Sequence, residues 1–170
     1  MLKLNFKTMK KYLKFMAFAM MAVFSLAFVS CGDDDDDEPT NVDSDYVGTW
    51  SVQRVEGWGY DEDNSFEYVQ LKSDGTYIDV QELTEEDIED DEYLGFYTEK
   101  EKAQGYVVYR GEWSVSSNKL FLKVSTPTNF KGTTLTYDIV KKEKDKLTVS
   151  MLGITSYLIR VNDKTIEKYL

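Results

Sequence analysis

Residues 133–140 read TTLTYDIV, and this stretch decides the fold. Leu135, Tyr137 and Ile139 alternate with threonines and an aspartate, a period of two that predicts a half-buried β-strand. The next segment, residues 146–151, repeats the alternation, and the charged sequence KKEKDK that joins the two predicts an exposed turn. The two segments therefore form a β-hairpin.

The same pattern continues outward over most of the chain. Asp74 and Gly75 form a dipeptide favoured in tight hairpins, because these residues tolerate a positive φ. Eight strands are expected, over residues 46–55, 66–72, 76–83, 106–114, 119–125, 133–141, 146–151 and 155–161. The short links between consecutive strands indicate that these strands are antiparallel neighbours in one sheet. Closure of the sheet into a barrel would leave no exposed edge strand. The expected fold class is all-β, an antiparallel up-and-down barrel of about eight strands, with a two-sheet sandwich as the alternative.

Two tripeptides resemble a family signature. Gly48-Thr49-Trp50 resembles the Gly-x-Trp signature of lipocalins, residues 111–113 repeat it, and Arg160 stands where lipocalins place an arginine across the tryptophan. The Thr-Asp-Tyr element of the core lipocalins has no counterpart here. The resemblance implies a lipocalin-like barrel in which Gly48, Trp50, Trp113 and Arg160 are structural and close one end, with the guanidinium stacked on the indole. Plain core packing with a surface arginine is the alternative.

The barrel interior is the expected ligand site. An eight-stranded barrel is just wide enough to be filled by side chains or to hold one small molecule. The chain has 12 tyrosines and 9 phenylalanines, which could line such a space with rings and hydroxyl groups. Tyr109, Tyr137 and Tyr157 are the inward-facing candidates. Tyrosines that merely fill the interior are the alternative.

The N-terminal residues are typical of an exported lipoprotein. Lysines precede an apolar run over residues 15–29, the layout of a signal peptide, and Ser25 interrupts the run, which argues against a membrane span. The sequence FVSC at residues 28–31 resembles the bacterial lipobox, with Phe28 where leucine is more usual. That resemblance implies cleavage before Cys31 and lipidation of its thiol. An unmodified cysteine that ends an apolar helix is the alternative.

These patterns divide the chain into three parts. Residues 1–30 are the expected signal peptide, residues 31–45 a lipidated acidic tether, and residues 46–170 the barrel domain. The acidic run at 33–38 resembles an export signal that directs lipoproteins to the outer face of the cell. We therefore expect a lipid anchor in the outer membrane and display at the cell surface. A domain that faces the periplasm is the alternative, because a solvated acidic tether has the same sequence.

An acidic insert at about 82–104 interrupts the strands. Seven of the eight residues from 85 to 92 are acidic, and Thr84 followed by Asp87 predicts a helix start. The insert is expected to be a short helix or a long loop, whose apolar residues could cover the barrel mouth as a lid: Ile88, Tyr93, Leu94, Phe96 and Tyr97. Carboxylates suit calcium, yet no glycine-centred EF-hand loop is present, so we expect a solvated acidic face and no metal.

Composition excludes several functions. The net charge is −11, and removal of the signal peptide with its five lysines and no acids makes it −16, which opposes binding to nucleic acid. The chain has no histidine and a single cysteine, which removes the usual catalytic triads, zinc sites and disulfides. Asp79, Glu112 and Asp138 alternate with apolar residues and are expected to face solvent. We therefore expect neither a cofactor nor an enzyme.

Two functions remain. The first is a membrane-anchored surface lipoprotein whose barrel binds a small molecule, hydrophobic ligands included. The second is a surface interaction module that docks a protein or glycan partner through the acidic insert or the strand ends, with Trp58 and Tyr60 as candidate contact residues. The residues indicate neither the ligand nor the partner.

Overall fold

The computed structural model describes residues 42–57, 60–63 and 67–170. All belong to one compact unit of the chain, Glu38–Leu170. The expected signal peptide, Cys31, most of the tether and Trp58 lie outside the described residues, as does the side chain of Tyr60.

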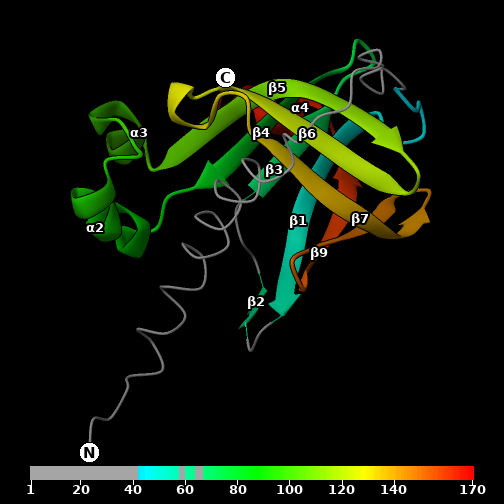
Figure 1. Cartoon of the computed structure of the whole chain (residues 1–170), viewed down its shortest axis with the longest axis horizontal. Helices are drawn as coiled ribbons and strands as arrows, with labels where there is room; N and C mark the ends of the chain where they lie inside the picture. Colours follow the sequence, from blue (N-terminus) through cyan, green and yellow to red (C-terminus); the bar gives the residue numbers. More distant parts are fainter. Residues whose placement is uncertain (1–41, 58–59, 64–66) are drawn as a thin grey trace, which may run out of the picture. The chain divides into compact units, whose positions relative to one another are not determined.

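Within the described part of the chain, nine antiparallel strands form one sheet, and eight of them close into a barrel (Figure 1). The strands are β1 (Gly48–Gly57), β2 (Tyr60–Asp63), β3 (Glu67–Leu71), β4 (Thr76–Glu82), β5 (Tyr106–Ser116), β6 (Lys119–Thr126), β7 (Thr134–Glu143), β8 (Lys146–Met151) and β9 (Ile154–Val161). Closure comes from the pairing of β1 with β9. The predicted eight-stranded up-and-down barrel is confirmed, and each predicted strand end lies within two residues of the observed one.

The short strand β2 was not expected. It pairs with Arg54–Gly57 of β1, and β3 pairs with Gly48–Ser51. Because β9 pairs along nearly all of β1, β2 and β3 share its other edge. The sequence YDED offers no apolar alternation, so its strand character comes from pairing alone.

The acidic insert forms two helices, α2 (Glu85–Leu94) and α3 (Glu99–Gln104), between β4 and β5. They project at one end of the barrel, which we call the insert end (Figure 1). Each begins with a capping box, Thr84 with Asp87 and Thr98 with Glu101, so the predicted helix start is confirmed. Gly95 ends α2 in the left-handed conformation, with φ of 63°.

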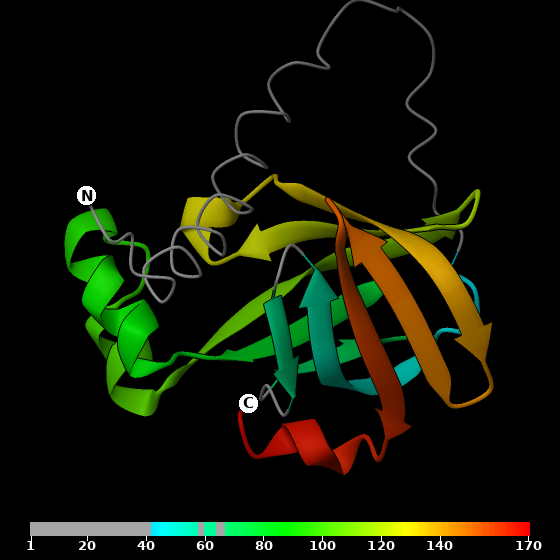
Figure 2. The same cartoon turned by 90° about the horizontal axis from the view of Figure 1, so that it is seen from below.

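A second, smaller apolar cluster lies outside the barrel. Ile78 and Val80 of β4 are buried against Ile166, with Tyr68, Tyr106, Val108 and Tyr169 packed around them. Ile166 belongs to α4 (Lys164–Glu167), which runs beside the strands near the C-terminus (Figure 2). Strand β4 is therefore covered on both faces.

This double burial corrects the prediction for Asp79. The side chain was expected to face solvent, yet it is only 4% exposed. Because Ile78 and Val80 face α4, the alternation of the strand turns Tyr77 and Asp79 into the barrel. The other two carboxylates, Glu112 and Asp138, are exposed as predicted.

Candidate ligand site in the barrel interior

One end of the barrel, here called the tryptophan end, is closed by a fully buried Trp50. The guanidinium carbon of Arg160 lies 4.3 Å from the centroid of its ring, and the two residues are paired in register across β1 and β9. The indole Nε1 donates to the carbonyl oxygen of Tyr46 at 2.9 Å. Arg160 donates to the carbonyl oxygens of Val47 and Asp45, so its planar group ties the first turn to the last strand.

Gly48 and Trp113 lie at the same end. Gly48 has a φ of 137°, and a Cβ built on it would lie 2.3 Å from Nη1 of Arg160, so only glycine fits there. Trp113 is buried, and its Nε1 donates at 2.8 Å to the carbonyl oxygen of Lys72 in the turn after β3. The structure thus brings Gly48, Trp50, Trp113 and Arg160 to one end, where their contacts are structural.

A polar cluster occupies the inner face of β4 and its neighbours. Asp79 lies in register between Val69 of β3 and Tyr109 of β5, and Tyr77 lies two residues earlier on the same face. Paired residues on one face of a sheet are close enough for their side chains to interact. Glu67 is the diagonal neighbour of Asp79 on β3. A carboxyl group and two phenols are therefore grouped on the inner wall.

Two polar atoms of this cluster lack a hydrogen-bond partner among the described residues. Nε2 of Gln81 donates to Oδ2 of Asp79 at 2.7 Å, but Oδ1 of Asp79 and the hydroxyl of Tyr77 have none. Tyr77 is 1% exposed. A buried polar group without a partner costs about 1–3 kcal/mol, and nearly all such groups in native proteins are satisfied. These atoms therefore mark a place where a further molecule would find partners.

Burial dominates the electrostatics of the cluster. It raises the pKa of the Asp79 carboxyl well above its usual range; the nearby carboxyl of Glu67 adds to the rise, and the hydrogen bond from Gln81 opposes it. Burial also raises the pKa of the Tyr77 and Tyr109 hydroxyls, and the charge of Asp79 raises both further. The interior is thus a region of low dielectric in which the neutral form of the Asp79 carboxyl is favoured.

The three candidate tyrosines of the sequence do not share one site. Tyr109 is buried beside Asp79, and Tyr137 extends inward from β7 against the same core. Burial raises the pKa of the Tyr137 hydroxyl, and Glu67 and Asp79 add to the rise, so this hydroxyl is near the acidic wall. Tyr157 differs: it alternates with buried Leu158, which puts it on the outer face of β9.

The hydroxyl of Tyr157 donates to Glu56 of the adjoining strand β1. The prediction that Tyr157 faces inward is therefore wrong. Residues 157–159 are all apolar or aromatic, so alternation alone did not identify the inner face of β9.

The helical insert reaches the interior through Tyr97, in the link between α2 and α3. Tyr97 and Ile88 pack against the barrel core, and the Tyr97 hydroxyl is hydrogen-bonded to Tyr109. Burial raises the pKa of Tyr97 to about 12, with further contributions from the insert carboxylates. Of the residues predicted to form a lid, Ile88 and Tyr97 thus contact the barrel core. The side chains of Tyr93 and Leu94 lie outside the described residues.

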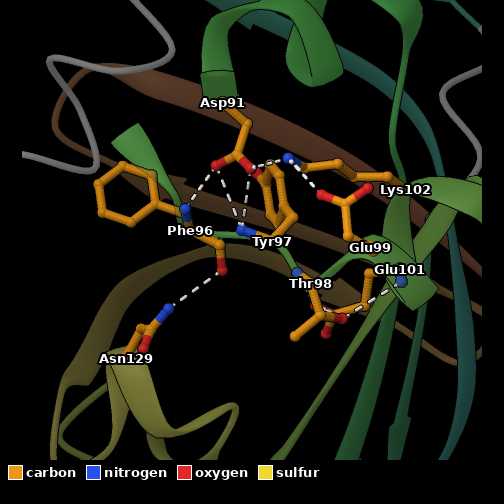
Figure 3. A network of polar contacts seen from close by, with 8 residues as sticks. All are labelled: Asp91, Phe96, Tyr97, Thr98, Glu99, Glu101, Lys102 and Asn129. Carbon is orange, nitrogen blue, oxygen red and sulfur yellow. Dashed lines mark hydrogen bonds and ion pairs between the residues drawn. The ribbon is translucent and has the colours of Figure 1, made fainter. Parts of the chain in front are cut away.

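Asp91 fixes the position of this link (Figure 3). Its side chain is 1% exposed and accepts hydrogen bonds from the backbone amides of Phe96 and Tyr97. Nζ of Lys102 lies 2.9 Å from Oδ2 of the same carboxylate. The expectation of a wholly solvated acidic face is therefore wrong for Asp91, whose charge orders the segment that carries Tyr97.

Two kinds of feature are absent from the described residues. In these ranges, no three Asp, Glu, His or Cys side chains gather closely enough to hold a metal ion. None of the described helices is long and apolar enough to cross a membrane.

Sequence reasoning missed Tyr77, Asp79, Glu67 and Gln81 as site residues. A signal was present in the C-terminal segment, where Ile166 and Tyr169 stand three residues apart. This spacing is typical of a helix with one apolar face. A helix there needs an apolar partner, and the outer face of a strand such as β4 provides one.

Comparison with known proteins supports the fold. No family model matches this chain, and no curated protein matches it. Among solved structures, a lipocalin-like protein from Bacteroides uniformis matches with a TM-score of 0.51 and 12% identity, over 69% of this chain and 99% of that one. An uncharacterized protein from Bacteroides eggerthii matches with a TM-score of 0.47 and 9% identity, over 68% and 99%. The chain is therefore a lipocalin-like barrel in fold.

Proposed function

We propose that this chain is a lipid-anchored protein whose barrel binds a small molecule in its interior. The observation that carries the binding proposal is the pair of buried, unpartnered atoms, Oδ1 of Asp79 and the hydroxyl oxygen of Tyr77. A ligand that donates hydrogen bonds to them would remove the cost of leaving them unsatisfied. The lipocalin-like fold supports the same function.

The surroundings of these atoms suit a ligand. Val69 and Val107 are buried on the inner wall, and the ring of Tyr109 lies among them. Apolar walls with a few convergent polar groups are typical of small-molecule sites. Glu67 and Gln81, a register pair at the insert end, are partly exposed, so solvent reaches the inner wall from that side. We infer that a ligand enters at the insert end and is stopped by the closed tryptophan end.

Native mass spectrometry of the chain purified from its own host tests this function. We expect a co-bound small molecule on the wild-type chain, which is lost or much reduced in Asp79→Asn. The matched control is Asp138→Asn, because Asp138 is an exposed aspartate on the outer face of β7 and should not affect binding. Repeated preparations that carry no additional mass would contradict the proposal and favour a docking module.

The anchor is proposed from the sequence FVSC at residues 28–31 and the acidic run behind it. Lipidation of Cys31 would hold the barrel at a membrane, because several acyl chains bind far more firmly than one. Wild-type cells fed an alkyne analogue of palmitate should give a labelled, membrane-bound chain, and Cys31→Ala should give neither. Added protease should remove the barrel domain from intact cells if it faces outward. Membrane association that survives Cys31→Ala would contradict the anchor.

A further inference from the structure

The innermost part of the candidate site is sealed on the side of the insert. Glu67 and Gln81, at the rim of the barrel, are partly exposed. Asp79 and Tyr109, which are paired across β4 and β5, are only 4% and 5% exposed. A ligand that reaches Asp79 from the insert end therefore has to displace the residues that cover Tyr109.

Two aromatic side chains cover Tyr109. The hydroxyl of Tyr97, in the link between α2 and α3, is hydrogen-bonded to it. The ring of Phe130, in the turn after β6, meets the ring of Tyr109 edge to face, with 5.8 Å between the centroids. The ring of Phe96 lies 5.7 Å from that of Phe130, and Nδ2 of Asn129 donates to the carbonyl oxygen of Phe96 at 3.1 Å (Figure 3). These contacts hold the link against the barrel mouth.

The insert is held together by contacts of its own. Each helix has its own capping box, and the carboxylate of Asp91 binds the amides of the link and Lys102 of α3. The chain enters and leaves the insert side by side, where the amide of Leu83 donates to the carbonyl oxygen of Gly105 at 2.9 Å. Gly105 has a φ of 76°, and a Cβ there would meet nothing within 4 Å. Residues at the ends of elements commonly act as hinges, so the insert can turn here as one body.

We propose that the insert is a hinged gate, which turns about Leu83 and Gly105 to admit the ligand and closes when Tyr97 meets Tyr109. This inference rests on the proposed function and adds how the ligand enters and leaves. The hydrogen bonds that hold the gate closed are individually weak in water, so the open form stays accessible. When the gate is closed, it keeps water away from the bound molecule.

Binding rates of N-phenyl-1-naphthylamine, an uncharged fluorescent probe, test the gate by stopped flow. Tyr97→Phe keeps the ring and removes the hydroxyl that bonds to Tyr109. Because entry and exit both wait for opening, the association and dissociation rate constants should both rise about two- to tenfold, with little change in affinity. Asn129→Ala should act in the same direction from outside the insert. Tyr157→Phe is the matched control, since it removes a hydroxyl on the outer face of β9 and should change neither rate.

The same experiment can contradict the gate in two ways. A rise in the dissociation rate alone would make Tyr97 an ordinary contact of the ligand and overturn the proposal. Rates in Tyr97→Phe and Asn129→Ala that match those of the wild type would also overturn it.

A distance measurement tests the hinge without any ligand. In a Cys31→Ala background, nitroxide labels are attached to Lys100→Cys on α3 and Glu112→Cys on β5, both at exposed positions. Double electron–electron resonance on the ligand-free chain should show a second distance population beside the closed one. Tyr97→Phe should raise the ratio of open to closed about two- to tenfold. A single distance distribution, the same with and without Tyr97→Phe, would overturn the gate.

The gate and the proposed function can fail separately. If a molecule binds and its rates do not respond to Tyr97→Phe, ligand binding stands and the gate is wrong. If the second distance is present but no molecule co-purifies and the probe does not bind, the hinge is supported and the proposed function is wrong.

Discussion

The guanidinium of Arg160 lies on the indole ring of Trp50, with 4.3 Å between the guanidinium carbon and the ring centroid. The two residues are 110 positions apart and directly paired where β9 meets β1 to close the barrel. Arg160 also donates to two backbone carbonyls of the segment before β1, those of Val47 and Asp45. The contact therefore joins the two ends of the sheet.

Replacement of Arg160 should destabilise the barrel without affecting ligand chemistry at the other end. Arg160→Ala removes a cation–π contact and two hydrogen bonds, and we expect the free energy of unfolding to fall by about 2–3 kcal/mol in urea denaturation. Arg160→Lys keeps the charge but loses the planar guanidinium group, so its free energy of unfolding should lie between those of the wild type and Arg160→Ala. An unfolding curve for Arg160→Ala that matches the wild type would show that the contact contributes nothing.

Gly111 should not tolerate a side chain. A Cβ at this position would lie 1.9 Å from the carbonyl oxygen of Lys123 and 2.8 Å from the ring of Tyr77, at the bulge between β5 and β6. Gly111→Ala should therefore cost at least about 3 kcal/mol or prevent folding. Gly132→Ala is the control, because its Cβ meets nothing within 4 Å and only its φ of 87° opposes the change. Equal stability of the two variants would contradict the close approach.

Asp91 should order the insert and not the barrel. Its carboxylate accepts two backbone hydrogen bonds and pairs with Lys102, so loss of its charge weakens the contacts that hold the link between α2 and α3. Asp91→Asn should therefore speed hydrogen exchange of the Phe96 and Tyr97 amides and leave the strands protected. Glu99→Gln removes an exposed partner of Lys102 and should change little. Unchanged exchange at Phe96 and Tyr97 would contradict the role given to Asp91.

Asp79 should make stability depend on pH. Its carboxyl faces Glu67 of β3, Tyr109 of β5 and Tyr137 of β7, with Tyr77 on its own strand. Burial holds its pKa in the folded state above the ordinary value of 3.8. The stability that the protonated group contributes is therefore fully present below about pH 3.8 and is lost as the pH rises through the folded pKa.

Asp79→Asn cannot ionise and should remove this dependence. In the ligand-free chain, urea unfolding at pH 8 should show the variant more stable than the wild type by about 1–3 kcal/mol, with a much smaller difference at pH 4. The matched control is Asp138→Asn, because this side chain is exposed on β7 and pairs with Lys119 away from the barrel interior. The same Asp79→Asn effect at both pH values would mean that burial of Asp79 does not shift its titration.

Period-two alternation predicted the barrel well because most strands have one inner and one outer face. In β7, Leu135, Tyr137 and Ile139 lie on the core side as the sequence indicates. Strand β4 differs, since Ile78 and Val80 pack beneath α4 and the polar residues face inward. Alternation shows which residues share a face, but the identity of the inner face depends on what covers the other one.

Charge runs were less informative than apolar periods. Asp91 looks like its acidic neighbours in the sequence, yet the backbone amides of Phe96 and Tyr97 and the ammonium group of Lys102 contact its carboxylate. That environment arises only when the link between α2 and α3 folds back, and Gly95 in the left-handed conformation permits it. The capping pair Thr84 and Asp87 was predictable because it is local. The burial of Asp91 was not, because it depends on residues up to 11 positions away.

Binding of a small molecule in the barrel interior is tested most directly by hydrogen exchange of β4 and β5 in two forms of the chain. One form is purified from its host with its bound molecule, and the other is unfolded, dialysed and refolded to remove it. We predict slower exchange in residues 76–82 and 106–116 of the first form, because the ligand bridges these strands at Asp79 and Tyr109. Identical exchange of both segments in the two forms would contradict the account.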